Sequence, residues 1–302
     1  MITHDREYFY KYVSAETAKA ILTTEKVRWS SPRLFNDPFD VQFDLQFPFT
    51  EEKYVDAVVK KMRTHFKDGR KQEVVADSTT VAAFNYLLDV MGKGDPAQIN
   101  EYIDEIVRPS AIEGYQKVQG NLESKNQFVR DSLFGLCIFC MSEKYDDLLM
   151  WSHYAASHTG AVIKFRCLPE LDTAFCAATP VQYQPDMPAW ATLDELIEDL
   201  FAEKPLGTIH HFHRLAATKS TAWEYEKEWR MISKFRNPEL VYQGYVDYKI
   251  FPEEVSGIIF GCRISSDAKA EIQEILAAKF SHATQLQAST DPSQSGLVFS
   301  DT

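Results

Sequence analysis

The chain has 302 residues, of which 45% are hydrophobic and 25% are charged. This composition is typical of a globular protein with enough length for one large domain or two small ones. The formal net charge of −12 argues against a generally basic surface that coats DNA, although it leaves room for a local basic groove.

The sequence gives no sign of export or of a membrane span. The first residues, MITHDREYFYKYV, lack an apolar core and include early acidic residues, so we expect no signal peptide. The longest apolar run, residues 134–141, is too short to cross a bilayer. The five cysteines are an odd number without disulfide-framework spacing, so we expect reduced thiols, a cytoplasmic location and no membrane partner.

The first elements are a predicted strand, helix and strand. Aromatic residues 9–13 favour a strand. Ser14, followed by Thr17 and periodic apolar residues, predicts a capped helix. Residues 27–30 return as a strand, and a rigid turn with Asn36, Asp37 and Pro38 follows. This turn either tucks its ends into a core or presents Asp37 and Asp40 to a ligand.

Residues 51–131 have the pattern of helices. Apolar residues recur there at spacings of three and four. They are Tyr54, Val55, Val58, Val59, Met62, Phe66, Phe84, Leu87, Leu88, Met91, Ile99, Tyr102, Ile103 and Ile106. We interpret the stretch as a helical insertion used for packing or for recognition of a partner protein, because nothing in it indicates chemistry.

A strand, a helix and a second strand are predicted over residues 134–165. Residues 134–142 form a buried strand, and residues 148–158 form a helix that begins after Asp146 and Asp147. Gly160 is expected to end this helix before the strand 161–165. His153 and His158 lie near the end of the helix, where a lone histidine is more often structural than catalytic.

The last third of the chain alternates short strands with helices. The predicted elements are a strand at 181–183, helices at 193–202 and 210–217, a strand at 255–260, a helix at 266–280 and an edge strand at 297–299. We therefore expect one domain over residues 1–290, with the insertion at 51–131 and a tail at 291–302.

Residues 219–235, KSTAWEYEKEWRMISKF, alternate with a period of two. In a strand, Glu224, Glu226, Glu228 and Arg230 would share one face, opposite Trp223, Tyr225, Lys227, Trp229 and Met231. A helix is less suitable because the aromatic residues share no helical stripe. The segment is then either an edge strand with a solvated acidic face or a strand that carries a catalytic carboxylate.

Glu226 and Glu228 would lie side by side on that strand. Two carboxylates this close repel each other, so one must have a raised pKa or find a cation. Lys219, Lys227 and Arg230 are nearby in the sequence.

These elements predict an α+β fold. A mixed, mainly antiparallel sheet would contain residues 9–13, 134–142, 161–165 and 223–231, with helices packed around it.

The common sequence motifs for binding nucleotides or metals do not indicate a function for this chain. Cys137 and Cys140 have the spacing of half a zinc site, but a strand would point their sulfurs to opposite faces, so we predict buried thiols and no metal site. The sequence contains no Gly-rich phosphate loop and no GxSxG nucleophile motif.

Several motifs in the same order resemble the bacterial family of domains of unknown function 2971. They are Tyr10-Lys11-Tyr12, Ser31-Pro32, Phe35-Asn36-Asp37-Pro38-Phe39-Asp40, Leu149-Met150-Trp151-Ser152-His153-Tyr154-Ala155 with His158 and Gly160, Trp223-x-Tyr225-Glu226-x-Glu228-Trp229-Arg230, and Phe260-Gly261. The resemblance extends from about residue 8 to residue 280.

The layout also resembles a diverged ADP-ribosyltransferase. This resemblance implies NAD as the cofactor, with Lys11 at the first-strand position, Ser142 or Tyr154 at the second, and Glu226-x-Glu228 as the catalytic pair. Lys11 would hold the pyrophosphate, and Tyr12 or Tyr154 would stack on nicotinamide. We also predict Arg230 as a cofactor-binding residue, and we expect four further residues to line the same pocket: Asn36, Asp37, Trp151 and His153. Lys11 stands where such enzymes usually carry His or Arg, and a Ser-Thr-Ser run is absent from the sequence.

These observations predict an ADP-ribosyltransferase-like enzyme that modifies a protein or nucleic acid, as a toxin or an antiviral defence effector would. Two alternatives stay open. A metal-dependent nuclease could use Asp37, Asp40, Glu226 and Glu228 around a divalent ion. A non-catalytic sensor or binding module could use the aromatic residues to build a pocket.

Overall fold

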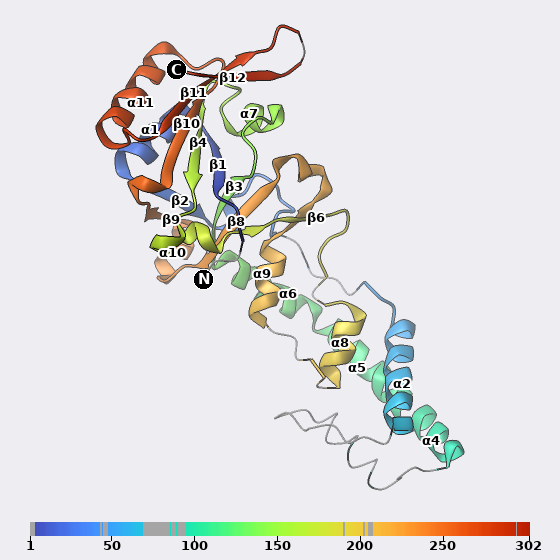
Figure 1. The fold of residues 1–302 in the computed structure, drawn as a ribbon. Helices are drawn as coiled ribbons and strands as arrows, with labels where there is room; N and C mark the ends of the chain where they lie inside the picture. The colour runs from blue at the N-terminus through green and yellow to red at the C-terminus, as the bar shows by residue number, and fades with distance from the viewer. Residues whose placement is uncertain are drawn as a thin grey trace. The chain divides into compact units, whose positions relative to one another are not determined.

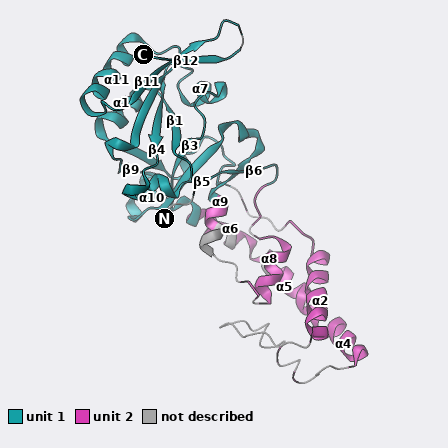
Figure 2. Cartoon of the chain, viewed as in Figure 1, with its two compact units in different colours: residues 1–43, 132–186, 216–302 teal, residues 44–131, 187–215 magenta. Residues whose placement is uncertain are grey.

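A computed structural model of the protein describes residues 4–42, 44, 48–68, 85, 89, 95–189, 191–201, 203, 204, 208–293 and 295–302. The chain forms two compact units (Figure 2). The sheet unit comprises residues 1–43, 132–186 and 216–302, and the helical unit comprises residues 44–131 and 187–215. The helical unit therefore contains a second stretch, 187–215, in addition to the predicted insertion.

The sheet unit is built on one large sheet of ten strands (Figure 1). They are β1 (Tyr8–Val13), β2 (Lys26–Ser30), β3 (Leu136–Ser142), β4 (Ala161–Arg166), β5 (Thr179–Pro180), β8 (Glu228–Lys234), β9 (Tyr245–Lys249), β10 (Val255–Phe260), β11 (Thr284–Thr290) and β12 (Leu297–Asp301). The main order is β12-β11-β10-β4-β1-β3-β2-β9, and β8 pairs with both β3 and β5. Each of these pairs is antiparallel except β10 with β11, which confirms the α+β prediction.

Helices pack on the sheet according to the alternation of side chains along β1. Phe9 and Val13 point into the core cluster that also contains residues of α1 (Ala15–Thr24) and α11 (Ser266–Lys279). Tyr12 points to the other face, where it meets α7 (Leu148–Tyr154). Ser14 caps α1 as predicted, because its hydroxyl accepts a hydrogen bond from the backbone N–H of Thr17 at 3.1 Å.

The other elements of the sheet unit are short. They are α10 (Pro238–Gln243), the parallel pair β6 (Gln182–Gln184) and β7 (Thr218–Ser220), and the 3₁₀ helices Pro32–Leu34, Pro169–Leu171, Ala174–Ala177, Thr221–Glu226 and Pro252–Glu254. The tail contributes β12, which pairs with β11 at the end of the strand order and agrees with the predicted edge strand.

Helices form the second unit, as the spacing of apolar residues predicts. They are α2 (Glu51–Asp68), α4 (Pro96–Tyr102), a π-helical turn (Ile103–Val107), α5 (Arg108–Gly120), α6 (Leu122–Phe134), α8 (Leu193–Leu200) and α9 (Thr208–Ala216), with α6 and α9 ending in the sheet unit. Val59 and Phe66 of α2 pack with Ile103, and Ile197 and Phe201 join the same core. The predicted apolar positions Phe84, Leu87, Leu88 and Met91 lie outside the described residues. None of the described helices is long and apolar enough to cross a membrane.

The predicted helix at 148–158 is too long. The α-helix ends at Tyr154, and Ala156, Ser157 and His158 all adopt left-handed backbone conformations, with φ of 48°, 53° and 70°. Gly160 follows this turn, and a Cβ atom there would lie 2.1 Å from the carbonyl oxygen of Val13. Gly160 is thus required for close backbone approach, and it does not terminate the helix.

The predicted strand at 223–231 is wrong in its first half. Thr221–Glu226 is a 3₁₀ helix, Lys227 is left-handed with φ 44°, and β8 begins only at Glu228. Trp223, Tyr225 and Lys227 therefore do not form one row with Trp229. From Glu228 onward the alternation holds, and β8 lies between β3 and β5, so the edge-strand interpretation is also wrong.

Candidate active site

A pocket of about 430 Å³ opens in the sheet unit, a size within the range of roughly 300–1,000 Å³ that is usual for ligand sites. We call it the site pocket. Its lining residues come from β1, β2, β3, α7, the turn at 34–40 and the segment 219–228. They are Tyr10, Lys11, Tyr12, Arg28, Ser30, Leu34, Phe35, Asn36, Asp40, Ile138, Cys140, Met141, Ser142, Met150, His153, Tyr154, Lys219, Glu226 and Glu228.

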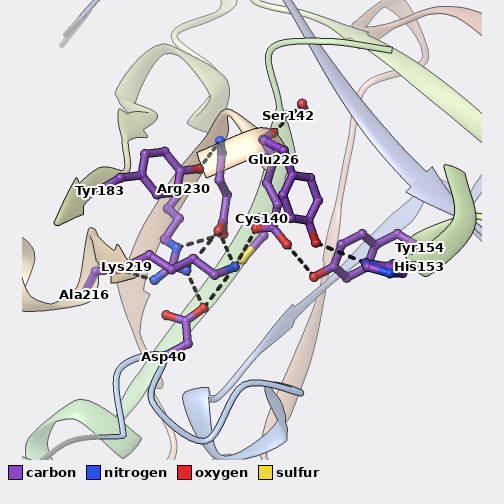
Figure 3. A network of polar contacts seen from close by, with 12 residues as sticks. Asp40, Cys140, Ser142, His153, Tyr154, Tyr183, Ala216, Lys219, Glu226 and Arg230 are labelled. Carbon is purple, nitrogen blue, oxygen red and sulfur yellow. Dashed lines mark hydrogen bonds and ion pairs between the residues drawn. The ribbon is translucent and has the colours of Figure 1, made fainter. Parts of the chain in front are cut away.

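One buried ammonium group holds three carboxylates in this pocket. Lys219 Nζ lies 2.5 Å from Glu226 Oε2, 3.0 Å from Glu228 Oε2 and 3.4 Å from Asp40 Oδ2 (Figure 3). All four side chains are buried. Such a cluster is stable only if the charges compensate one another, since isolated charges in a protein interior are costly.

Arg230 provides the second cation and is completely buried. Its Nε donates to Glu228 Oε1 at 2.8 Å, and its Nη2 donates to Asp40 Oδ2 at 2.6 Å and to Glu228 Oε2 at 3.1 Å. Its Nη1 donates to the carbonyl oxygen of Ala216 at 2.7 Å. Asp40, Lys219, Glu226, Glu228 and Arg230 form a network, which we call the ionic network. With all groups ionised, its three carboxylates exceed its two cations by one charge.

Glu226 is the carboxylate whose ionisation the site opposes. Burial and the neighbouring charge of Glu228 raise its pKa, while Lys219 and the hydrogen bond from Tyr154 act in the opposite direction. The Tyr154 hydroxyl donates to Glu226 Oε1 at 2.5 Å. Burial and the charge of Glu226 raise the pKa of this phenol, so Tyr154 stays a hydrogen-bond donor.

The pKa of Glu228 is shifted in the opposite direction. Burial disfavours its ionised form, but the charges of Arg230 and Lys219 outweigh burial and hold its pKa below the usual range. Burial also disfavours the charged form of Lys219, yet Glu228, Asp40 and Glu226 raise its pKa. Two adjacent carboxylates whose pKa values are pushed apart are typical of sites that transfer protons.

The backbone around the acid pair is fixed from both sides. The left-handed Lys227 turns the chain between the 3₁₀ helix and β8, which lets both carboxylates reach Lys219. The Ser142 hydroxyl donates to the carbonyl oxygen of Glu226 at 2.7 Å. The backbone N–H of Glu228 donates to the Tyr183 hydroxyl at 2.8 Å. These bonds position the acid pair before any ligand binds.

Lys11 lines the site pocket with both glutamates, but its ammonium has a different partner. Its Nζ donates to the carbonyl oxygen of Cys140 at 2.7 Å and lies 4.9 Å from the centre of the Phe139 ring. The cations in contact with the acid pair are Lys219 and Arg230. Arg230, predicted to contact a cofactor, donates to Glu228, to Asp40 and to the carbonyl oxygen of Ala216 and is not among the lining residues of the pocket.

Two predicted aromatic residues support the pocket wall. Trp151 is fully buried and donates from Nε1 to the carbonyl oxygen of Tyr145 at 2.8 Å. Tyr12 packs edge-to-face on Trp151 with ring centres 5.5 Å apart, and its hydroxyl donates to the carbonyl oxygen of Lys144 at 3.1 Å. Tyr12 lines the pocket, whereas Trp151 is a buried residue of α7 itself and anchors this helix in the core cluster that contains Tyr12.

The residues of the turn at 34–40 have different roles, because some line the pocket and others stabilise the turn itself. Asn36 lines the pocket. Asp37 is buried and accepts a hydrogen bond from the backbone N–H of Phe39 at 2.9 Å, so it shapes the turn. Asp40 is the residue of this turn that joins the ionic network. His153 is exposed at the pocket and its Nδ1 lies 3.0 Å from the Tyr225 hydroxyl.

The two cysteines of the CxxC motif lie on opposite sides of β3, as a strand requires. Cys137 belongs to the hydrophobic core, whereas Cys140 lines the site pocket. Across the part of the chain that the structure describes, no group of three or more His, Cys, Asp or Glu side chains is arranged to hold a metal ion.

The predicted ADP-ribosyltransferase site does not include Lys219 or Asp40. Lys219 was noticeable only as one of three cations near the acid pair. The sequence indicates Asp40 as a polar residue of a turn and as a ligand of the alternative nuclease site, and 190 positions separate it from Arg230. Tyr183, which binds the backbone of Glu228, carried no signal in the sequence.

Fold and site together define an α+β protein with a pocket above a buried ionic network. Residues 150–231 match the family described as "Protein of unknown function (DUF2971)", which confirms the first resemblance for this part of the chain. The matched segment contains Tyr154, Lys219, Glu226, Glu228 and Arg230. No curated protein and no solved structure is significantly similar to the chain.

Proposed function

We propose that the site pocket binds NAD⁺ as a substrate and that the protein is an ADP-ribosyltransferase-like enzyme acting on a macromolecule. One observation carries the proposal. The Glu226 carboxylate lines the pocket between the Tyr154 hydroxyl and the Lys219 ammonium, with Glu228 beside it. A positioned carboxylate next to a ligand-sized pocket suits a reaction that develops positive charge on a sugar.

The proposed reaction exchanges one bond of the sugar for another. The glycosidic bond between C1′ of the ribose and the nicotinamide nitrogen breaks, and its electron pair leaves with neutral nicotinamide. An oxygen or nitrogen of the acceptor forms the new bond to C1′, and its proton passes to Glu226. A carboxylate with a raised pKa is suited to accept that proton near neutral pH.

Other residues of the pocket suit the remaining parts of this substrate. Tyr10 and Tyr12 offer aromatic surface for the nicotinamide or adenine ring. Lys11 uses one of its three N–H donors on the Cys140 carbonyl, which leaves donors for a pyrophosphate. Asp40 Oδ1 is buried and has no hydrogen-bond partner among the described residues, so it can accept a bond from a ribose hydroxyl.

Glu228 has a positioning role in this proposal. Its carboxylate receives three hydrogen bonds from Lys219 and Arg230, so its charge is already compensated. It holds Lys219 where that ammonium can bind Glu226. The proposal therefore assigns proton transfer to Glu226 and assigns Glu228 to the support of the network.

The contacts of the carboxylates favour a transferase over the metal-dependent nuclease. A nuclease would need free carboxylate oxygens around a divalent ion. Here Lys219 already bridges Asp40, Glu226 and Glu228, and Arg230 binds Asp40 and Glu228, so a metal would have to displace buried cations. Modification of a macromolecule at the expense of NAD⁺ would suit a toxin or an antiviral defence effector.

The test measures nicotinamide release and transfer of label from NAD⁺ carrying a labelled adenylate phosphate to protein, RNA and DNA acceptors. We expect the Glu226→Gln variant to lose both activities by at least about a hundredfold, in the range that general-base groups contribute. Glu224→Gln is the matched control, because Glu224 lies in the same 3₁₀ helix but is exposed and paired with Lys227. A wild-type protein without either activity, or a Glu226→Gln variant as active as wild type, would refute the proposal.

A further inference from the structure

A second hollow lies in the helical unit, between α2 and the start of α5, and its charge is unlike that of the chain as a whole. It has a volume of about 450 Å³ and is lined by Asp56, Val59, Lys60, Arg63, Thr64, Lys67 and Arg108. We call it the basic groove. Four of these side chains are cationic and one is anionic, although the whole chain has a net charge of −12.

Three of the cations form a row on one face of α2. Lys60, Arg63 and Lys67 are spaced by three and four residues, so their side chains lie above one another over roughly 10 Å of the helix axis. All three side chains are exposed. A row of cations at this spacing presents several charges to a single extended partner.

Among the described residues, this row of cations has no acidic partner. Within the described residues, no carboxylate forms an ion pair with Lys60, Arg63 or Lys67. Other cations of the same unit do have such pairs, because Lys61 binds Glu203 and Arg108 binds both Asp56 and Asp104. The charge of Arg108 is therefore offset locally, and the free positive charge of the groove belongs to the α2 row.

We infer that the basic groove binds the phosphate backbone of a nucleic acid. Lys and Arg contacts to phosphates supply most sequence-independent affinity for nucleic acids, and the Arg guanidinium fits a phosphate in a bidentate way. The chain as a whole has a net charge of −12, so the positive charge of this groove distinguishes it as a contact surface for a polyanion. This inference goes beyond the proposed function and does not depend on NAD⁺ use.

The test uses the full chain and a fluorescently labelled, mixed-sequence single-stranded RNA of about twenty nucleotides, with binding followed by anisotropy at several salt concentrations. Three phosphate contacts predict that log K falls against log salt with a slope of about −2. The triple variant Lys60→Glu/Arg63→Glu/Lys67→Glu should bind at least about tenfold more weakly, with a slope near zero.

A second triple variant controls for net charge. Lys53→Glu/Lys117→Glu/Lys204→Glu changes three exposed cations of the same unit outside the groove and alters the net charge by the same amount. We expect it to keep most of the wild-type affinity and the salt slope. The inference is overturned if wild type does not bind RNA at low salt, if both triple variants bind equally, or if polyglutamate binds wild type in preference to RNA. Circular dichroism melting shows whether each variant is folded.

Discussion

The hydroxyl of Tyr154 and the carboxylate of Glu226 are joined by a hydrogen bond of 2.5 Å, although the two residues are 72 positions apart in the chain. This bond links α7 to the turn before β8 and connects the pocket wall with the ionic network. Charge-assisted hydrogen bonds to a carboxylate are among the stronger ones in proteins. The hydrogen bond from Tyr154 therefore influences both the orientation of the Glu226 carboxylate and its pKa.

Replacement of Tyr154 by Phe should impair catalysis and shift its pH dependence. The Tyr154 hydrogen bond lowers the pKa of Glu226, so its loss raises that pKa further. A base acts only when it is ionised, so the acidic limb of the rate profile should move to higher pH. We expect about a tenfold to hundredfold lower rate at neutral pH, recovered in part as the pH rises. Nicotinamide release measured across pH checks this.

Tyr225→Phe is the control for this change. The Tyr225 hydroxyl lies 3.0 Å from His153 Nδ1, and the tyrosine hydroxyl that donates to Glu226 is that of Tyr154. Loss of the Tyr225 hydroxyl should leave the acidic limb in place. An identical shift in both variants would mean that the Tyr154–Glu226 bond does not tune the carboxylate.

Most of the sheet could be predicted because its signals are local. The cap of α1, the strands β1, β3, β4 and β10, and the helix α11 follow from neighbouring residues alone. The 3₁₀ helix Thr221–Glu226 could not be predicted, because distant contacts hold it. The Ser142 hydroxyl binds the carbonyl oxygen of Glu226, and the backbone N–H of Glu143 binds that of Lys227. A sequence whose residue types alternate with a period of two can therefore contain a 3₁₀ helix where a strand is predicted.

The candidate site could be predicted only in part for the same reason. Glu226 and Glu228 are close in sequence, so their mutual repulsion and their need for a cation are visible there. The partnership of Asp40 with Arg230 joins the N-terminal turn to β8 and depends on the tertiary fold. Strand β11 could not be predicted either, because Thr284–Thr290 has only Leu286 and Ala288 as apolar residues. Its position in the sheet depends on pairing with β10.

The two glutamates should respond in opposite ways to neutral replacement. Glu228→Gln leaves Arg230 buried without its main partner, so the free energy of unfolding should fall by about 3–5 kcal/mol at neutral pH. Glu226→Gln removes a buried like charge and keeps an acceptor for Tyr154, so it should leave stability unchanged or higher. Urea unfolding of each variant at neutral pH measures the difference.

The pH dependence of stability follows from the same contacts. The folded pKa of Glu228 is lower than its unfolded value, so its stabilising contribution is present above the unfolded value of about 4.3 and is lost as the pH falls below it. Glu228→Gln should therefore have a flatter stability profile in acid than wild type. Equal acid sensitivity of the two proteins would show that Glu228 is not held ionised by the network.

Gly160→Ala should strongly disrupt the fold, although Gly160 lies outside the ionic network. A Cβ atom at this position would lie 2.1 Å from the carbonyl oxygen of Val13 and 2.9 Å from that of Ala155. Both contacts are with backbone, so β1 or the left-handed turn at Ala156–His158 must move to make room. We expect a loss of about 3 kcal/mol or more in the free energy of unfolding, at or above the upper range for overpacking.

Gly114→Ala is the matched control, because nothing lies within 4 Å of a Cβ there and Gly114 is in α5. Alanine in a helix interior is favoured over glycine by roughly 0.5–1 kcal/mol, so this control should melt at the same or a higher temperature than wild type. If Gly160→Ala melts at the same temperature as wild type, close approach of the backbone is not the reason that this turn requires glycine.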